Sequence, residues 1–369
     1  MSPRRLSTTS LQPLLYSAGA NADEVVGAYA FSATLAVQDI TGDAHSGVTA
    51  SHIAKRLEGS AESEAYLFAL TSHRTPRPLG GHGYPEITVD DLADIDAWVF
   101  ISLPLLEDTG IIEASVTLDA AIAPLPGEPV PEGPWGAALS LIDALSARLH
   151  RPIRHIWETH AVGAPSPAAG IVGTAGYSPA YREEQATFSI GDAQPAAAVA
   201  PMPVDSIEIV HNMDFPAADL ALFRDVLTAA SRDYPRGELK LDTVEWTEQR
   251  VRDAGARLLD RGGNQVTAIA YTADPATGGR TAVGMAEAVH YDSDDDALME
   301  LGLIYVLPQH RRRGVGTAVV EAALAAAQAQ WPGVETGYCS YPSISGAAHA
   351  MLKQRGAEAI SATTAWQRK

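Results

Sequence analysis

The stretch from Leu301 to Thr317 constrains the fold more than any other part of the chain, because it places an apolar strand, a glycine-rich turn and a helix in direct succession. The apolar run ends at Pro308, Arg-Arg-Arg-Gly-Val-Gly occupies 311–316, and an alanine-rich helix is expected from Thr317 to Gln330. Glycines let the backbone approach an anion closely, and the amides of a starting helix lack partners within the helix. Three arginines add charge-assisted hydrogen bonds. The pattern predicts a loop that holds a pyrophosphate.

Other phosphate-binding loops fit this segment less well. A Walker loop needs Gly-Lys-Ser or Gly-Lys-Thr, which the chain lacks. A dinucleotide-binding loop needs a third glycine, and Val319 occupies that position. A basic turn that merely caps a helix would not need three adjacent arginines in an otherwise acidic chain.

The chain of 369 residues has 26 lysines and arginines against 45 aspartates and glutamates, a formal charge of -19. This charge argues against general binding to nucleic acid or anionic membranes, and it would attract a cationic acceptor, although excess carboxylates also keep a surface soluble. The lone cysteine, Cys339, excludes an internal disulfide and a cysteine-clustered zinc site, so we expect it in packing and expect no metal. No apolar run approaches about 18 residues and the first residues lack a signal-peptide core, which predicts a cytoplasmic protein without membrane contact.

A small, proline-punctuated stretch at 191–203 has no periodicity and is typical of a linker. Because the chain exceeds one ordinary domain of about 100 to 200 residues, we predict two domains, 1–192 and 205–369, joined by a linker at 193–204. The second domain is expected to follow the order β-α-α-β-β-β-α-β-α-β. Its strands are predicted at 206–210, 265–272, 281–291, 299–306, 334–341 and 359–367, and its helices at 217–230, 247–261, 317–330 and 345–355.

The first 190 residues follow this order more faintly, which suggests a duplication. Helices are predicted at 22–38, 51–57 and 135–149, and strands at 64–70, 97–105, 110–118 and 153–160. The connection at 121–134 is rich in proline and contains two glutamates but no basic residue. Prolines lack N–H donors and glutamates repel phosphate. The first domain is therefore predicted to be a degenerate copy without a pyrophosphate loop.

The sequence Arg-Arg-Arg-Gly-Val-Gly at 311–316 matches the Arg/Gln-x-x-Gly-x-Gly/Ala signature of the GCN5-related N-acetyltransferase (GNAT) superfamily, and 306–308 and 317–318 also fit its pattern. The chain resembles this family closely over 205–369 and, in the first domain, by element order. The resemblance implies an α/β fold of two tandem acetyltransferase-like domains, each a mostly antiparallel twisted sheet flanked by helices. It also implies acetyl-CoA as co-substrate, with the pyrophosphate on the loop and the pantetheine beside the preceding strand. The implied acetyl-CoA-binding residues are Ile304, Tyr305, Val306, Arg311, Arg312, Arg313, Gly314, Val315, Gly316, Thr317 and Ser345.

In enzymes of this superfamily a backbone N–H on that strand polarises the thioester carbonyl, and here it would come from 304–306. The acceptor amine attacks directly, without a covalent enzyme intermediate. Because the amine must be deprotonated, a carboxylate is needed near the thioester. Glu300 matches the position where several members carry a functional glutamate, and we predict it to be the catalytic base or amine ligand; a solvated charge opening the strand is the alternative interpretation. Glu287, on the neighbouring strand, is the reserve candidate.

The superfamily's second signature, Asn-x-x-Ala-x-x-Leu-Tyr-x-x-x-Gly-Phe, is eroded. Leu352 replaces the tyrosine that can protonate the leaving thiolate, a role that positioned acids make worth about 10²- to 10⁴-fold. Either another group serves or catalysis is slow. Tyr338 and Tyr341 could bring a phenol to this region, but we interpret each as an ordinary strand aromatic. Of the remaining signature positions, two are kept, Ala348 and Gly356. Three are replaced: Ser345 stands for Asn, Met351 for Leu and Ala357 for Phe.

The favoured function is an N-acetyltransferase that moves an acetyl group from acetyl-CoA to an amine of a small molecule, or less readily of a protein, in a ternary complex. Two alternative functions stay open. One is an acyl-CoA-binding regulatory or scaffold protein, and the other is a nucleotide-binding enzyme that uses the same loop. We expect an acceptor pocket around 234–246, where Glu238, Asp242 and Glu245 suit a cation, although loops are commonly acidic. The expected assembly is a monomer or a homodimer without nucleic acid.

Three further patterns are interpreted as structural. The acidic run 292–296 lacks the glycine and terminal glutamate spacing of a calcium-binding EF-hand. The segment 155–160 contains two histidines but alternates like a strand and matches no zinc motif. The glycines at 80–83 lie between prolines with no helix after them, which indicates a turn.

Overall fold

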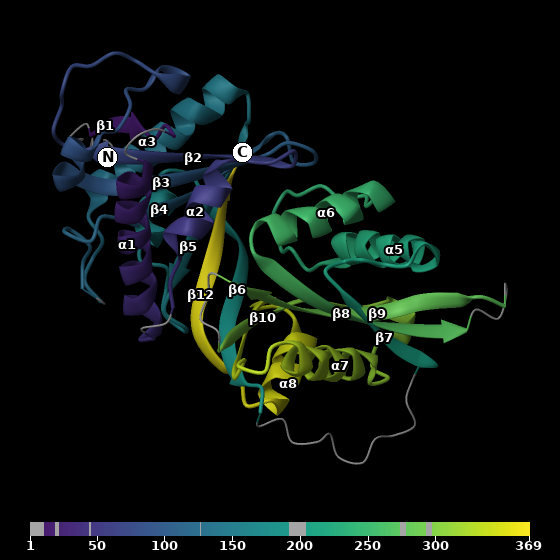
Figure 1. Ribbon diagram of the computed structural model, residues 1–369. Coiled ribbons are helices and arrows are strands. Elements are labelled where there is room, and N and C mark those ends of the chain that lie inside the picture. The colour runs from purple at the N-terminus through teal and green to yellow at the C-terminus, as the bar shows by residue number, and fades with distance from the viewer. Residues whose placement is uncertain are drawn as a thin grey trace. The chain divides into compact units, whose positions relative to one another are not determined.

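The computed structural model describes residues 11–18, 22–43, 46–125, 127–191, 204–273, 278–292 and 297–369 (Figure 1). The chain divides into two compact units. Unit 1 comprises residues 1–182, 237–241 and 360–369, and unit 2 comprises 183–236 and 242–359. The predicted linker falls almost entirely outside the described residues, so the boundary placed there stays a prediction.

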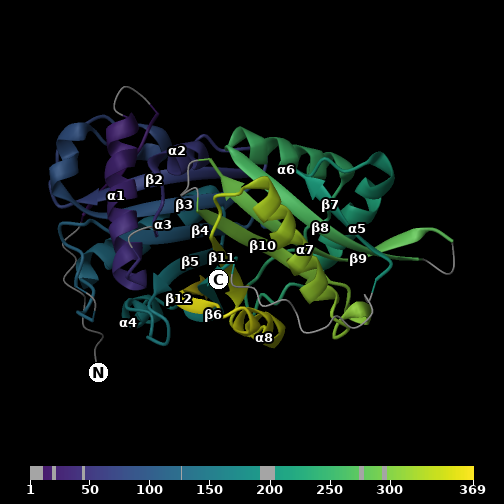
Figure 2. The same ribbon diagram turned by 60° about the horizontal axis from the view of Figure 1, so that its bottom comes forward.

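Unit 2 is a mixed sheet with helices on both faces. Its strands follow the order β6-β11-β10-β9-β8-β7, and all neighbours are antiparallel except the parallel pair β10 and β11. Helices α5 and α6 cover one face and α7 and α8 the other, as both views show (Figures 1 and 2). The strands are β6 (Ser178–Ser189), β7 (Ser206–His211), β8 (Gly263–Ala273), β9 (Arg280–Tyr291), β10 (Leu298–Val306) and β11 (Thr336–Pro342), and the helices are α5 (Ala217–Asp233), α6 (Glu248–Asp260), α7 (Val315–Gln330) and α8 (Gly346–Gln354), with a 3₁₀ turn at Pro308–His310.

Strand alternation divides the apolar side chains of unit 2 between two cores. On β8, Val266, Ala268 and Ala270 belong to the core under α7, while Ile269 and Tyr271 belong to the core under α5 and α6. This is the period of two expected for a strand buried on both faces. A continuous apolar run therefore positions the central strands, and both helix layers can pack on them.

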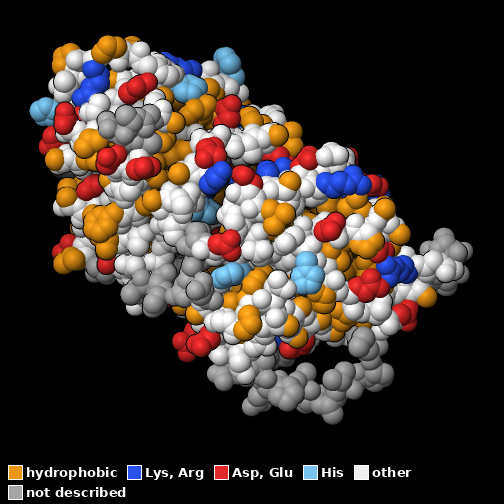
Figure 3. Space-filling view, in the orientation of Figure 1, with side chains coloured by type: hydrophobic (Ala, Val, Ile, Leu, Met, Phe, Trp, Pro, Cys, Tyr) orange, Lys and Arg blue, Asp and Glu red, His pale blue; other side chains and the backbone are white. Residues whose placement is uncertain are grey.

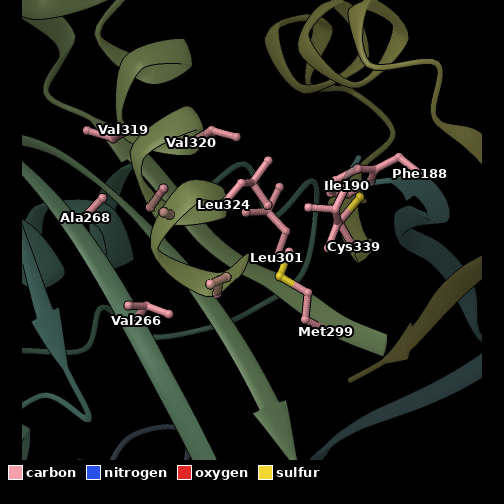
Figure 4. Close-up of a cluster of buried hydrophobic side chains, with 14 of the residues drawn as sticks. Phe188, Ile190, Val266, Ala268, Met299, Leu301, Val319, Val320, Leu324 and Cys339 are labelled. Atoms are coloured by element: carbon pink, nitrogen blue, oxygen red, sulfur yellow. The ribbon is translucent and has the colours of Figure 1, made fainter. Parts of the chain in front are cut away.

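The core under α7 packs this helix against β8 and β10 (Figure 4). Val319, Val320 and Leu324 of α7 pack there with Leu301 of β10, and burial of each such side chain contributes about 1.5 to 3 kcal/mol. Cys339 lies in the same cluster and is 3% exposed, so the structure places it in packing.

Unit 1 has the same architecture. Its strands follow the order β1-β2-β3-β4-β5-β12, with α1 and α2 packed on one face and α3 and α4 on the other. Trp98 and Ile53 lie in the first core and Trp135 and Val172 in the second. The strands are β1 (Gln12–Leu15), β2 (Ser63–Thr71), β3 (Ile95–Pro104), β4 (Ile111–Leu118), β5 (Ile153–His160) and β12 (Glu358–Arg368), and the helices are α1 (Ala22–Thr41), α2 (Ala50–Leu57), α3 (Glu132–Leu149) and α4 (Ala169–Thr174), with 3₁₀ turns at Gly81–Gly83 and Val89–Asp94.

In the structure, both halves of the sequence have the element order β-α-α-β-β-β-α-β-α-β. Three elements of the first half, β1, α4 and β6, were not predicted from the sequence. Strand β1 and helix α4 are short, and β6 carries Arg-Glu-Glu-Gln at 182–185, which hides its alternation. The last strand of each half of the sequence pairs with strands of the other half. Strand β12 pairs with β5 in unit 1, and β6 pairs with β11 in unit 2.

Acidic side chains are scattered over the visible face of the molecule, with basic ones interspersed (Figure 3). Among the described residues, no helix is both long enough and apolar enough to span a bilayer.

Candidate active site

Strands β10 and β11 of unit 2 run side by side at one end and then separate. Their backbone pairs join 298–300 to 336–338, and within the described strands the pairing stops at Glu300 and Tyr338. In unit 1 the corresponding parallel strands, β4 and β5, pair over a longer stretch, 111–115 with 153–157. The separation leaves residues 301–306 of β10 without a partner on β11, whereas β4 extends past its last β5 partner only over 116–118.

The open edge of β10 presents backbone donors. The register of β10 against β9 shifts between Leu301 and Ile304, which marks a bulge. Beyond the bulge, the amide of Leu307 donates to Val283 of β9 at 2.9 Å. Because donors alternate along an antiparallel strand, the N–H groups of Ile304 and Val306 point away from β9, toward the open edge, whereas that of Tyr305 points to β9. An extended ligand lying along this edge would find these two donors.

The arginine-glycine loop leads from β10 into α7, which begins two residues earlier than predicted, at Val315. Gly314 caps the helix at φ 85°, in the left-handed region that favours glycine. Val315 is buried in the core, and a Cβ at Gly316 would lie 3.6 Å from the Val306 side chain. As the first residues of the helix, 315–317 have amides without intrahelical partners, directed at the loop.

The three arginines of the loop have different surroundings. The guanidinium of Arg311 donates to the carbonyl oxygen of Val306 at 2.8 Å, lies 3.4 Å from Asp233 and stands over the Tyr305 ring at 5.5 Å. The Tyr305 hydroxyl donates to the same carboxylate at 2.6 Å. Arg311 therefore fixes the loop to β10 and to the end of α5, a role that sequence reasoning did not assign.

Arg312 and Arg313 are exposed, and Arg312 adopts a positive φ of 60°. Such a backbone conformation is costly for a residue with a side chain, and it persists where the surroundings hold it. Here the clamp at Arg311 and the cap at Gly314 hold the turn from both sides. The two exposed guanidinium groups lie beside the helix start, where an anion is favoured.

Two carboxylates lie on the face of unit 2 opposite α7. Ala286 and Ala288 belong to the core under α7, so the intervening Glu287 points to the other face, and the same alternation around Met299 and Leu301 places Glu300 there. Glu300 is exposed, at the point where β10 and β11 separate. The predicted base and its reserve are thus on one face of adjacent strands.

Glu287 is half-buried and has an unusual protonation equilibrium. Burial, with the charge of Glu300 nearby, raises the pKa of Glu287 to about 7. Hydrogen bonds from the Leu303 amide and the Gln265 side chain act in the opposite direction. The Leu303 amide lies within the β10 bulge, and Gln265 also donates to Thr267 at 2.9 Å. The bulge thus supplies a donor that orients this carboxyl group.

The phenols near the site are weak acids. Burial raises the pKa of Tyr338 to about 12, and Glu300 adds to the shift. Burial also raises the pKa of Tyr341 to about 12, and its hydroxyl donates to Glu184 at 3.1 Å. Burial raises the pKa of the Cys339 thiol to about 12, so this thiol is no nucleophile at neutral pH.

The eroded second signature begins at the N-cap of helix α8 and runs along this helix. Leu352 is 4% exposed and packs in the core under α7, so an apolar side chain at this position serves the fold. Ser345 is the N-cap of α8, and its hydroxyl accepts the Ala348 amide at 3.3 Å. Among the described residues, no group of three or more His, Cys, Asp or Glu side chains could hold a metal ion. Of the acidic run 292–296, Asp292 is described and 293–296 lie outside the described residues.

A mixed sheet with two splayed parallel strands and a helix-start loop beside the splay is typical of acyltransferase folds, and unit 1 repeats the sheet and its helices without the basic loop. The family comparison agrees for most of unit 2: residues 225–357 match the model of the acetyltransferase (GNAT) family. No curated protein matches the sequence.

Solved structures share the whole tandem fold. A tandem GNAT protein from the clavulanic acid biosynthesis pathway is 15% identical, with a TM-score of 0.66 over 97% of this chain and 98% of that one. A GCN5-related N-acetyltransferase from Sphaerobacter thermophilus is 14% identical, with a TM-score of 0.61 over 96% of this chain and 95% of that one. A glucosamine N-acetyltransferase region of a fungal β-N-acetylglucosaminidase is 12% identical, with a TM-score of 0.58, over 98% of this chain and 38% of that one. At these identities the likeness establishes the fold.

Proposed function

We propose that this protein is an acetyl-CoA-dependent N-acetyltransferase that acts on a small-molecule amine, with acetyl-CoA bound in unit 2. The observation that carries the proposal is the open edge of β10 directly before the helix-start loop. An extended pantetheine would accept hydrogen bonds from Ile304 and Val306, and the pyrophosphate would lie against the amides of 315–317 with Arg312 and Arg313 alongside.

The proposed reaction joins the amine nitrogen to the thioester carbonyl carbon and breaks the carbon–sulfur bond, whose electron pair leaves with the thiolate. The proton of the attacking amine passes to a carboxylate. Glu287 is suited to accept it, because a base with a pKa of about 7 is ionised in half of the molecules at neutral pH and still binds a proton well. Glu300 is proposed to attract and orient the ammonium form of the acceptor from its exposed position on the same face.

The thiolate is proposed to leave without a phenolic acid. A thiol has a pKa of about 8.5, so a phenol with a pKa of about 12 gives up its proton to the thiolate only with difficulty. Leu352 in the core cannot donate either. In this respect the chain departs from the family signature.

Unit 1 is proposed to bind no acetyl-CoA. Its strands β4 and β5 separate over a shorter stretch than β10 and β11, and the connection before α3 lacks basic residues. The proposed enzyme thus has one catalytic unit and one non-catalytic unit.

The test is turnover of acetyl-CoA by the full chain over a panel of amines, with thiol release as readout and mass detection of the acetylated product. Glu287→Gln should lower kcat by about 100-fold or more while calorimetry shows unchanged acetyl-CoA affinity. Glu300→Gln should raise KM for the amine, and Glu335→Gln, an exposed position, serves as the matched control. If neither test variant alters turnover, the roles of both carboxylates are wrong. If acetyl-CoA binds but no amine is acetylated, the protein is an acyl-CoA-binding regulator.

A further inference from the structure

The connection between α5 and α6 leaves unit 2 and returns to it. Its middle, Gly237–Leu241, belongs to unit 1, whereas Arg236 and Asp242 on either side belong to unit 2. The guanidinium of Arg236 donates to the carbonyl of Asp242 at 3.0 Å and closes the neck of this loop. This loop was expected to form the acceptor pocket.

The return half of the loop is fixed along α5. The amide of Val244 donates to the Ser231 hydroxyl at 2.8 Å, and that of Trp246 donates to the Thr228 hydroxyl at 3.0 Å. These bonds hold 242–246 against unit 2. They leave the conformation of 237–241 to be determined by the contacts of this segment within unit 1.

One side chain of β12 binds the segment as a neighbouring strand would. The Gln367 oxygen accepts the Lys240 amide at 2.7 Å, and its nitrogen donates to the Glu238 carbonyl at 3.2 Å. His155 of β5 is fully buried, and its Nε2 lies 3.1 Å from the same oxygen. In the tautomer with a proton on Nε2, His155 donates to that oxygen and fixes which end of the amide faces Lys240.

The backbone of the segment also approaches β6 closely. The Glu238 amide donates to the Ala180 carbonyl at 2.7 Å. Gly237 has φ 59°, and a Cβ there would collide with the same carbonyl oxygen, so only glycine fits. Leu239 is buried in a small cluster with Tyr181 and Ala365. The segment is thus bound through its backbone on two sides and through one apolar anchor.

We infer that Gln367 is a positioning residue that sets the conformation of segment 237–241, in the loop proposed to receive the acceptor amine. The inference rests on the proposed function for the role of the loop. Its structural part, that Gln367 holds 237–241, stands apart from any activity.

Gln367→Leu tests this, because leucine keeps most of the volume and removes both hydrogen bonds. The matched control is Gln354→Leu, at the exposed end of α8. Hydrogen exchange of the full chain should show at least tenfold faster exchange of the Lys240 amide in Gln367→Leu only. With an amine that the wild-type protein acetylates, the KM of Gln367→Leu for that amine should be at least tenfold above the wild-type value. Its Kd for acetyl-CoA should stay within twofold of wild type. Gln367→Glu, which keeps the acceptor for Lys240 but loses the donor to Glu238, should fall between wild type and Gln367→Leu in both readouts.

The outcomes separate the two proposals. Unchanged exchange at Lys240 overturns the positioning role, whatever the activity. Faster exchange at Lys240 with an unchanged acceptor KM shows that the loop does not shape the acceptor site. This result also overturns the positioning role of Gln367. If wild-type protein acetylates no amine, the proposed function fails, and the exchange result still decides whether Gln367 holds the loop. Should Gln367→Leu unfold, Gln367→Glu provides the same comparison in a more conservative variant.

Discussion

Replacing Glu287 with glutamine should raise the stability of the protein while it removes activity. In the folded state, burial raises the pKa of Glu287 from 4.5 to about 7. At about 1.4 kcal/mol per unit, ionising this half-buried carboxyl costs the folded state about 3 kcal/mol above pH 7. The folded state binds the proton more tightly, so this cost is absent below pH 4.5 and grows as the pH rises to 7. Glutamine keeps an oxygen for the Leu303 amide and carries no charge.

Urea unfolding of wild type and Glu287→Gln at pH 5 and pH 8 measures this effect. We expect the variant to be more stable by less than about 1 kcal/mol at pH 5 and by about 1 to 3 kcal/mol at pH 8. In the same preparations, wild-type kcat should rise with pH through an apparent pKa near 7, and the variant should lack this limb. Equal stability at both pH values, or a variant that is less stable at pH 8, would refute the reasoning that burial raises this pKa.

Three further changes probe the loop and the leaving group. Arg312→Gln and Arg313→Gln should each weaken acetyl-CoA binding about tenfold or more and reduce its salt dependence in calorimetry, whereas Arg311→Gln should also lower Tm because it releases Val306 and Asp233. Gly314→Ala should destabilise the protein by about 1 to 2 kcal/mol and weaken acetyl-CoA binding, and a Gly316→Ala variant that costs as much stability would contradict the role of φ. Tyr338→Phe should change kcat less than tenfold, and a loss near 100-fold would identify its phenol as the acid.

Much of the secondary structure follows from local sequence. The apolar run of β10, the glycines after it and the alanine-rich helix predict three successive elements, and the structure extends α7 by only two residues at its start. Thr247, the first residue of the helix predicted at 247–261, is the N-cap of α6, and its side chain accepts the Arg250 amide. These signals are strong because capping, glycine conformation and apolar periodicity act within a few residues of one another.

The site could be predicted only in part. The loop and the two carboxylates are visible in the sequence, but Asp233, which holds Arg311 and Tyr305, lies more than 70 residues away along the chain. Nothing in the local sequence distinguishes Glu287 from Glu300. Their different exposure arises from the bulge in β10 and the packing of neighbouring strands, and exposure decides which carboxyl has a pKa near neutrality.

The sequence alone determined the element order of the second half, the arginine-glycine loop between β10 and α7 and the partial resemblance of the two halves, because each depends on residues close together in the chain. The tertiary structure decided the separation of β10 from β11, the clamp at Arg311 and the exchange of β6 and β12 between the repeats. It also decided that Gln367 would meet the loop at Lys240, 127 positions earlier in the chain. Strand partners and buried charges are set by which surfaces meet, and that choice minimises the free energy of the whole chain, so no local segment encodes it.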